Sequence, residues 1–224
     1  ENLLGLKPLN GKLSVPPEFL KQKPLWNKLS HGEPLDQIKI VDAHVHQAPP
    51  AMGGYVLPES DLELSLPGMI RTMDKIGIAH NIVIGAKALY NDCAAGNKEI
   101  AEKTKDYRSR FHGYWGFNPH QYKNITEELL EKDFADGFFV GFKTLCGYWG
   151  VAHDDPRFKV MLEFAEKHAL PILIHTWNDV DTLWNVVPHY KNIKFVIAHC
   201  GGENSGRKKA IALAKEYNNV YLET

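Results

Sequence analysis

The chain has 224 residues and a formal net charge of −1, from 26 basic and 27 acidic side chains. This balance provides no basic excess for a polyanion, so we expect no nucleic-acid partner. Apolar residues make up 44% of the chain, enough for a sizeable core, and no run approaches the roughly 18 apolar residues of a membrane span. The composition therefore predicts a globular protein that binds neither nucleic acid nor membrane.

The first 37 residues differ in composition from the rest of the chain. They contain little hydrophobic periodicity and five prolines, namely Pro8, Pro16, Pro17, Pro24 and Pro34. We interpret residues 1–37 as a proline-rich leader that packs on the outside of the domain, with one short helix near residues 18–23.

From residue 38 to residue 224, apolar strands alternate with amphipathic helices at a regular interval. The predicted strands cover residues 38–44, 81–85, 113–117, 138–144, 171–175, 193–199 and 220–223. A Pro/Gly-rich loop over residues 48–60 precedes the first helix, and the predicted helices cover residues 66–73, 96–107, 125–134, 156–168, 179–187 and 206–217. Such an alternation predicts a parallel sheet covered by helices.

The number of strands decides between two α/β architectures. Seven strand–helix units without a glycine-rich dinucleotide loop favour a TIM-type (β/α)8 barrel over a doubly wound sheet. The count is one strand short of a closed barrel. We therefore expect residues 38–224 to form a barrel whose last strand is missing from this chain, so that the domain is incomplete at its carboxyl end.

Histidines stand at the carboxyl ends of three predicted strands. His44 and His46 are two residues apart, so both side chains would leave the first strand on the same face. His175 ends the run Pro-Ile-Leu-Ile-His, and His199 ends the run Phe-Val-Ile-Ala-His. One such histidine is more often a hydrogen-bonded core residue. Three barrel strands that all end in histidine predict a metal site, because functional groups gather at this end of a barrel.

Residues just after the predicted strands are candidates for the wall of a substrate pocket. These candidates are Asn118, Tyr148, Trp149, His153 and Trp177. Aromatic side chains at a barrel mouth can stack on a cyclic or aromatic small molecule. Plain packing is the alternative for about half of them.

Five short motifs, in this order, resemble the amidohydrolase superfamily. They are Asp-Ala-His-Val-His, Gly-Phe-Lys, Ile-Leu-Ile-His-Thr, Ile-Ala-His-Cys-Gly-Gly and Val-Tyr-Leu-Glu-Thr. The resemblance covers residues 38–224 and is to the amidohydrolase-related (amidohydrolase 2) branch of metal-dependent hydrolases and decarboxylases. It implies that His44, His46 and His175 bind a divalent metal, commonly zinc. It also implies that His199 is either a further ligand or a polarising catalytic group beside the metal.

Two positions depart from the family pattern. The family's aspartate after strand 8, which binds metal and handles the proton of the attacking water, has no counterpart before the chain ends. Lys143 stands where two-metal members carry a carbamylated lysine. Lys143 is, with His199, a candidate catalytic residue. Its alternative role is to contact the substrate or a neighbouring carboxylate without being carbamylated. We therefore expect one metal ion, or two if Lys143 is carbamylated.

The expected reaction follows from the metal. A divalent ion that keeps one position open for water lowers the pKa of that water toward about 7. We expect hydrolysis of an amide, lactone or ester of a small molecule, and the alternatives are decarboxylation of a small aromatic or unsaturated carboxylic acid and a non-catalytic metal-binding scaffold. Arginine, which binds carboxylates bidentately, is scarce near the predicted mouth, with only Arg157 and Arg207 there. This scarcity favours the hydrolase.

The cysteines bear on the cellular location. Cys93, Cys146 and Cys200 lie far apart in the chain and show no Cys-x-x-Cys spacing, which fits a reducing compartment. Residues 1–30 lack the apolar core of a signal peptide. We therefore expect a cytoplasmic protein. The sequence is compatible with a homo-oligomer such as a dimer.

Overall fold

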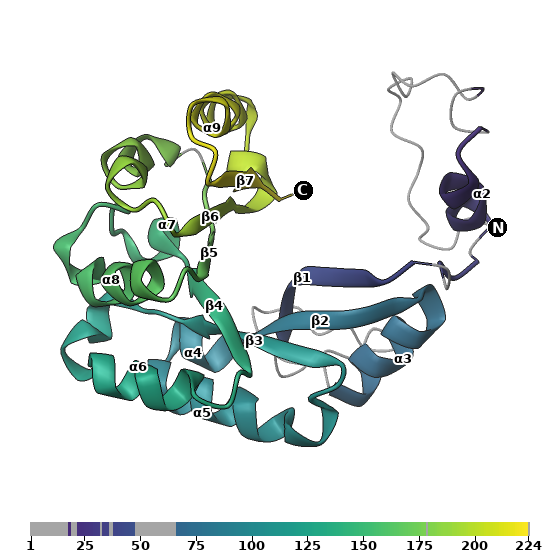
Figure 1. Cartoon of the computed structure of the whole chain (residues 1–224), viewed down its shortest axis with the longest axis horizontal. Helices are drawn as coiled ribbons and strands as arrows, with labels where there is room; N and C mark the ends of the chain where they lie inside the picture. The colour runs from purple at the N-terminus through teal and green to yellow at the C-terminus, as the bar shows by residue number, and fades with distance from the viewer. Residues whose placement is uncertain are drawn as a thin grey trace.

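The structure is a computed structural model that describes residues 18, 22–31, 33–35, 38–47, 66–177 and 179–223. The predicted loop over residues 48–60 lies outside these residues, and so do residues 19–21 of the predicted helix near residues 18–23. The leader contributes helix α2 (Pro24–Ser30), which Figure 1 shows beyond the start of the first strand. Leu35 is buried with its backbone against Gly77, so at least this part of the leader contacts the domain. The proposed covering role of residues 1–37 stays a prediction.

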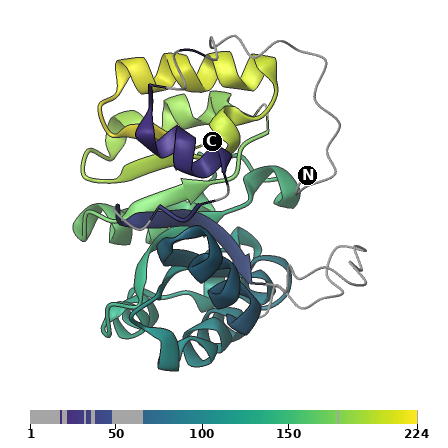
Figure 2. The ribbon, with the colours of Figure 1, turned by 90° about the vertical axis from the view of Figure 1, so that its right-hand side faces the viewer.

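Seven parallel strands form a single sheet in which each strand pairs with the next one along the chain. They are β1 (Ile40–Gln47), β2 (Ile78–Gly85), β3 (Phe111–Gly116), β4 (Phe139–Thr144), β5 (Pro171–Ile174), β6 (Lys194–Ile197) and β7 (Val220–Leu222). The sheet curls so that β7 comes round toward β1, as Figures 1 and 2 show from two sides. Among the described residues no strand pairing closes the side between β7 and β1. The predicted parallel α/β architecture is confirmed, as a curled barrel sheet one strand short of closure.

Helices cover the outer face of the curled sheet (Figure 1). The α-helices are α3 (Leu66–Ile76), α4 (Ala86–Tyr90), α5 (Cys93–Lys103), α6 (Glu127–Phe134), α7 (Cys146–Trp149), α8 (Lys159–Lys167) and α9 (Asn204–Glu216). Short 3₁₀ helices connect them: η2 (Lys105–Tyr107), η3 (Pro119–Asn124), η4 (Pro156–Phe158), η5 (Val180–Asn185), η6 (Val187–His189) and η7 (Ala198–Gly201). No helix among the residues described is long and apolar enough to cross a membrane.

Three local differences from the sequence-based expectation have physical causes. The predicted helix over residues 179–187 is instead η5 followed by η6, because 3₁₀ turns suit short segments and Pro188 is tolerated at the start of η6. The short helix α4 was not expected, since Ala86 follows Gly85 of β2 without any turn residue between them. The sixth strand ends at Ile197, two residues earlier than predicted, because the chain turns into η7 there.

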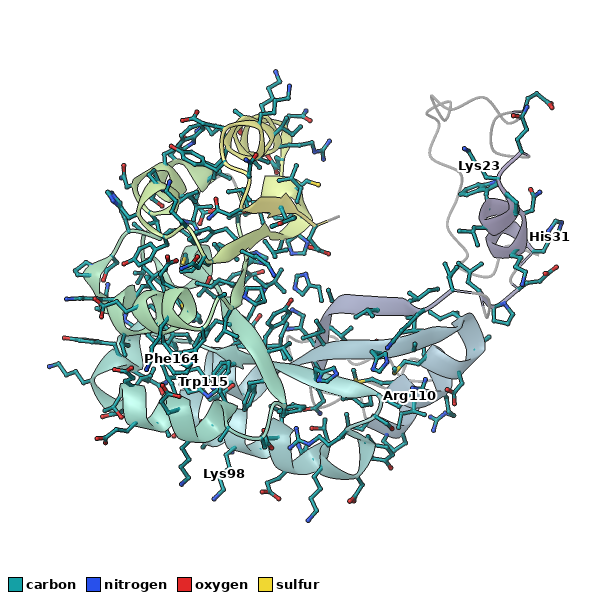
Figure 3. The ribbon with its side chains drawn as sticks, in the orientation of Figure 1. Lys23, His31, Lys98, Arg110, Trp115 and Phe164 are labelled. Carbon is teal, nitrogen blue, oxygen red and sulfur yellow. The ribbon has the colours of Figure 1, made fainter. Side chains whose placement is uncertain are left out.

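The main core lies between the sheet and its helices. Large aromatic side chains dominate it, and Figure 3 labels Trp115 on β3 and Phe164 on α8. The Phe134 ring lies 5.1 Å from Phe142 and 5.2 Å from Phe164, measured between ring centroids. The buried Trp115 indole N–H donates to Asp133 at 2.9 Å, so its one polar atom is paired. This packing fixes the strands whose carboxyl ends carry the site.

Candidate metal centre

The four histidines predicted from the strand ends lie together. The Nε2 atoms of His44 and His46 are 3.2 Å apart, as expected for two side chains on the same face of β1. The His199 ring centroid lies 5.2 Å from that of His44 and 4.9 Å from that of His175. The curl of the sheet therefore brings residues from β1, β5 and β6 to a single point.

His199 reaches this point from an unusual backbone turn. His199 and Cys200 have φ values of 55° and 49°, in the left-handed region that non-glycine residues rarely adopt. Such a conformation costs on the order of 1 kcal/mol for each residue, so surrounding contacts must hold it. Gly201 and Gly202 continue the turn at φ values of 85°. The strand prediction placed His199 at the end of a strand, and the structure places it inside this turn instead.

Lys143, at the carboxyl end of β4, joins the histidines. Its side chain is fully buried, and its Nζ lies 3.0 Å from Nε2 of His44. Burial lowers the pKa of Lys143 to about 7, with only partial compensation from the charge of Glu223. At neutral pH this side chain is therefore poised between its charged and uncharged forms.

Three of the histidines, His44, His46 and His175, have lowered pKa values that favour the neutral form, which binds metals. Burial, followed by the charge of Lys143, lowers the pKa of His46 to about 3 and that of His175 to about 4. The pKa of His44 is lowered by the same two causes, with its hydrogen bond to Glu223 acting in the opposite direction. Neutral imidazoles with free lone pairs are the state that a divalent cation requires.

Glu223 is a member of the site that the sequence analysis did not single out. Its Oε2 lies 3.2 Å from Nδ1 of His44 and accepts a hydrogen bond from the backbone N–H of His199 at 3.1 Å. One signal could have found it, because Glu223 ends the seventh predicted strand in the same way that His175 ends the fifth.

The residues present fit a divalent metal ion. Two nitrogens that each lie about 2.0–2.1 Å from a tetrahedral zinc are roughly 3.3 Å apart, close to the 3.2 Å between His44 and His46. His44, His199 and Glu223 each offer a ligand atom, and these atoms all lie within 4.8 Å of one another. Imidazole nitrogens gathered in this way are typical ligands of zinc and other divalent transition metals.

Two of the predicted substrate-binding residues lie beside His175, one of the clustered histidines. The rings of Tyr148 and Trp177 lie 5.0 Å and 6.5 Å from the His175 ring, measured between centroids. Both side chains are exposed, by 66% for Tyr148 and 55% for Trp177. Together with Gly147 and His175 they line an open pocket of about 400 Å³. A planar group bound there could stack on either ring.

Two further candidates, at the end of α7 and just before η3, each have a polar side-chain atom that is already paired. The Trp149 indole is half-buried and donates its N–H to the carbonyl of Leu89 at 3.2 Å. The Asn118 side chain is buried and accepts a hydrogen bond from the backbone N–H of His120 at 3.0 Å. These contacts organise the loops after β3 and β4, and a direct role in substrate binding stays a prediction for both residues.

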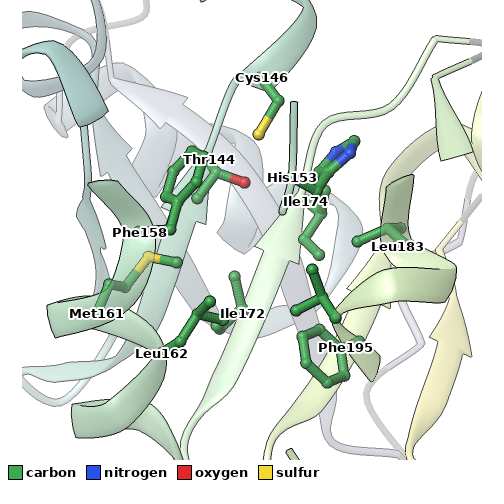
Figure 4. A pocket seen from close by; sticks show the side chains of 11 residues that line it. Thr144, Cys146, His153, Phe158, Met161, Leu162, Ile172, Ile174, Leu183 and Phe195 are labelled. Carbon is green, nitrogen blue, oxygen red and sulfur yellow. The ribbon is translucent and has the colours of Figure 1, made fainter. Parts of the chain in front are cut away.

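The structure does not bring His153 to the four clustered histidines. Figure 4 shows it on the wall of a separate apolar pocket that also contains Thr144 and Ile174. Only 5% of His153 is exposed, and its Nδ1 lies 2.8 Å from Oγ1 of Thr182. The loop after α7 folds inward and buries this ring, which the sequence alone could not indicate.

The fold and the site together define a class of protein, the barrel enzymes whose metal-ligating side chains stand at the carboxyl ends of parallel strands. The amidohydrolase family model matches residues 41–224, and the chain belongs to this family. The resemblance inferred from the five motifs is thereby confirmed. A search of curated proteins finds no match.

Solved structures show the same fold at low sequence identity. An uncharacterized TIM-barrel protein from Bordetella bronchiseptica is 20% identical, with a TM-score of 0.60 over 83% of this chain and 74% of that chain. A probable 2-pyrone-4,6-dicarboxylic acid hydrolase from Acinetobacter baumannii is 18% identical, with a TM-score of 0.57 over 79% and 66%. A dihydroxybenzoic acid decarboxylase from Polaromonas sp. JS666 with bound manganese is 17% identical, with a TM-score of 0.53 over 73% and 66%. The chain thus spans 66% to 74% of the length of these three proteins.

Proposed function

We propose that the protein is a metal-dependent hydrolase that cleaves an amide, lactone or ester bond of a small molecule. The observation that carries this proposal is the convergence of four histidines, with 3.2 Å between the Nε2 atoms of His44 and His46. His44, His46 and His175 would hold the ion. When bound, the ion supplies a water of lowered pKa and polarises the carbonyl of the substrate.

The remaining groups of the site have roles of their own. Lys143 reaches the same point as the metal ligands and, with a pKa near 7, can hold or release a proton at Nζ. His199 can ligate the ion or donate a hydrogen bond to the carbonyl oxygen that gains charge. Tyr148 and Trp177 would position the leaving part of the substrate against the wall of the open pocket.

We propose zinc as the metal, one ion in each chain, because three histidines and an open position suit it. Manganese is the alternative, and the Polaromonas decarboxylase with bound manganese supports it. A second ion would require carbamylation of Lys143.

Decarboxylation of a small aromatic or unsaturated carboxylic acid is the second candidate, favoured by the exposed rings of Tyr148 and Trp177. A decarboxylase needs a group that binds the substrate carboxylate. Arg157 donates hydrogen bonds of 2.8 and 2.9 Å to the two carboxylate oxygens of Asp155, so this pair of N–H groups is already engaged. This pairing supports the hydrolase over the decarboxylase.

The activity test uses the full-length protein. It is incubated with lactones, aryl esters, amides and aromatic carboxylic acids, before and after the metal is removed by a chelator and restored. We expect hydrolysis that falls about a hundredfold or more on metal removal and returns on addition of Zn²⁺ or Mn²⁺. Release of CO₂ from the acids without any hydrolysis would replace the hydrolase by the decarboxylase. Bound metal without turnover of any compound would instead support a scaffold.

We further propose a cytoplasmic location and a small-molecule partner. Cys93, Cys146 and Cys200 are all free, which supports a reducing compartment. The net charge of −1 supports the expectation that nucleic acid is not a partner.

A further inference from the structure

Glu223 connects the two edge strands of the curled sheet. It follows β7 directly, and its Oε2 lies 3.2 Å from Nδ1 of His44 on β1. The two side chains are largely shielded, with 9% of His44 and 22% of Glu223 exposed. A hydrogen bond to a carboxylate in such a place is stronger and more directional than one at an exposed surface.

This contact determines which nitrogen of His44 faces the metal position. An ionised carboxylate can only accept hydrogen bonds, so Nδ1 of His44 must carry the proton that it donates to Glu223. In the neutral ring Nε2 then bears the lone pair. Nε2 is also the atom that lies 3.2 Å from Nε2 of His46 and 3.0 Å from Nζ of Lys143. The lone pair therefore points to the place where the other ligands meet.

Glu223 also holds the left-handed turn that carries His199. Its carboxylate accepts from the backbone N–H of His199 at 3.1 Å, and its carbonyl accepts from the N–H of Cys200 at 2.7 Å. Its own N–H donates to the carbonyl of Ile197 at 2.9 Å. One residue thus pairs the backbone on both sides of His199, where the conformation needs outside support.

We propose that Glu223 is the positioning residue of the metal centre. Its carboxylate holds His44 in the tautomer that presents Nε2 to the ion, and the same residue fixes the turn that presents His199. The expected effect on metal binding rests on the proposed function. In this proposal Glu223 is not itself a metal ligand. Partners that orient a ligating histidine in this way commonly affect metal affinity by about 10- to 100-fold.

The test compares full-length wild-type protein with Glu223→Gln, Glu223→Ala and the control Glu102→Gln. Gln keeps an acceptor oxygen and removes the charge, while Ala removes both. Glu102 is exposed on α5, so its variant controls for the change of charge. Competition with a chromophoric chelator gives the Kd for Zn²⁺. Nitrogen-15 NMR of the metal-free proteins gives the tautomer of His44.

We expect Zn²⁺ binding to weaken about 10- to 100-fold in both Glu223 variants and to stay unchanged in the control. The wild-type His44 should show a protonated Nδ1, and Glu223→Ala should lose this preference. Unchanged affinity in both variants, or a protonated Nε2 in the wild type, would overturn the proposal. A loss beyond about 10⁴-fold in Glu223→Gln would overturn it as well, by making Glu223 a ligand. Failure of the wild type to bind metal would refute the proposed function, while the NMR result would still test the hydrogen bond itself.

Discussion

Replacing Lys143 by methionine is expected to stabilise the metal-free protein by about 1–3 kcal/mol at pH 7, because a buried charge that is poorly compensated is replaced by an apolar side chain of similar length. Lys143 is fully buried, and its ammonium contacts a neutral ring, His44, rather than a carboxylate. The same variant should lose at least about a hundredfold in turnover, since a proton-transferring group contributes about 10²–10⁴. A Lys143→Met protein that is more stable but less active than the wild type would show that Lys143 serves function and lowers the stability of the fold.

The effect of this substitution should depend on pH in a defined direction. Burial depresses the pKa of Lys143 from 10.5 to about 7, so between these two values the unfolded chain binds more protons than the folded one. The free energy of unfolding of the wild type should therefore increase as the pH rises from 7 to about 10.5, as Lys143 loses its proton in the folded state. The methionine variant has no such group, so its stability should lack this increase. The advantage of the variant should be largest at or below pH 7 and shrink at higher pH.

Urea denaturation at pH 7 and pH 9.5, with a chelator present, measures this difference. Lys98→Met on the exposed face of α5 is the control, because it removes the same charge from a solvated position. A Lys143→Met protein that is less stable than the wild type at pH 7 would contradict the account. So would an advantage that does not change with pH.

Replacing Gly96 by alanine is expected to destabilise the protein by about 3–5 kcal/mol, which is a large part of the stability of a typical domain. A Cβ atom at Gly96 would lie 2.1 Å from the backbone nitrogen of Ala88 and 2.5 Å from its Cα. Both atoms belong to the backbone of α4, so α4 and α5 would have to separate. The neighbouring Asn97 bonds both backbone groups of Gly116, at 2.8 and 3.0 Å, so this movement would also disturb the end of β3.

Thermal and urea denaturation of the purified variant measure the loss. Gly137→Ala is a suitable comparison, because no atom lies within 4 Å of its added Cβ and only its φ of 73° opposes the change. We expect it to cost about 1 kcal/mol. A Gly96→Ala protein as stable as Gly137→Ala would show that α4 and α5 are not packed as described.

Much of the architecture could be predicted because local patterns determine it. The alternation of side chains on a strand is enough to place His44 and His46 on one face, and the structure puts their Nε2 atoms 3.2 Å apart. The spacing of Leu66, Met69 and Met73 predicted α3, and all three are buried there. Since parallel strands end at the same edge of a sheet, the apolar runs before His175 and His199 predicted that these rings would meet.

The parts that could not be predicted depend on how the chain turns after each strand. The apolar run before His199 favours a continued strand. The backbone instead leaves the strand at Ile197 and enters a left-handed turn held by Glu223, which follows β7. The contact between Glu223 and His44 joins positions 179 residues apart and needs the curl of the sheet. The burial of His153 depends on the path of the loop after α7. The sequence of this loop has no hydrophobic periodicity from which that path could be predicted.

The metal content of the purified full-length protein tests the central claim most directly. We predict about one divalent ion in each wild-type chain by inductively coupled plasma mass spectrometry, and less than about a tenth of that in His44→Ala and His175→Ala. Circular dichroism of the same samples would verify that the variants are folded. If folded His44→Ala and His175→Ala proteins retained the full metal content of the wild type, the assignment of these histidines as ligands would be wrong.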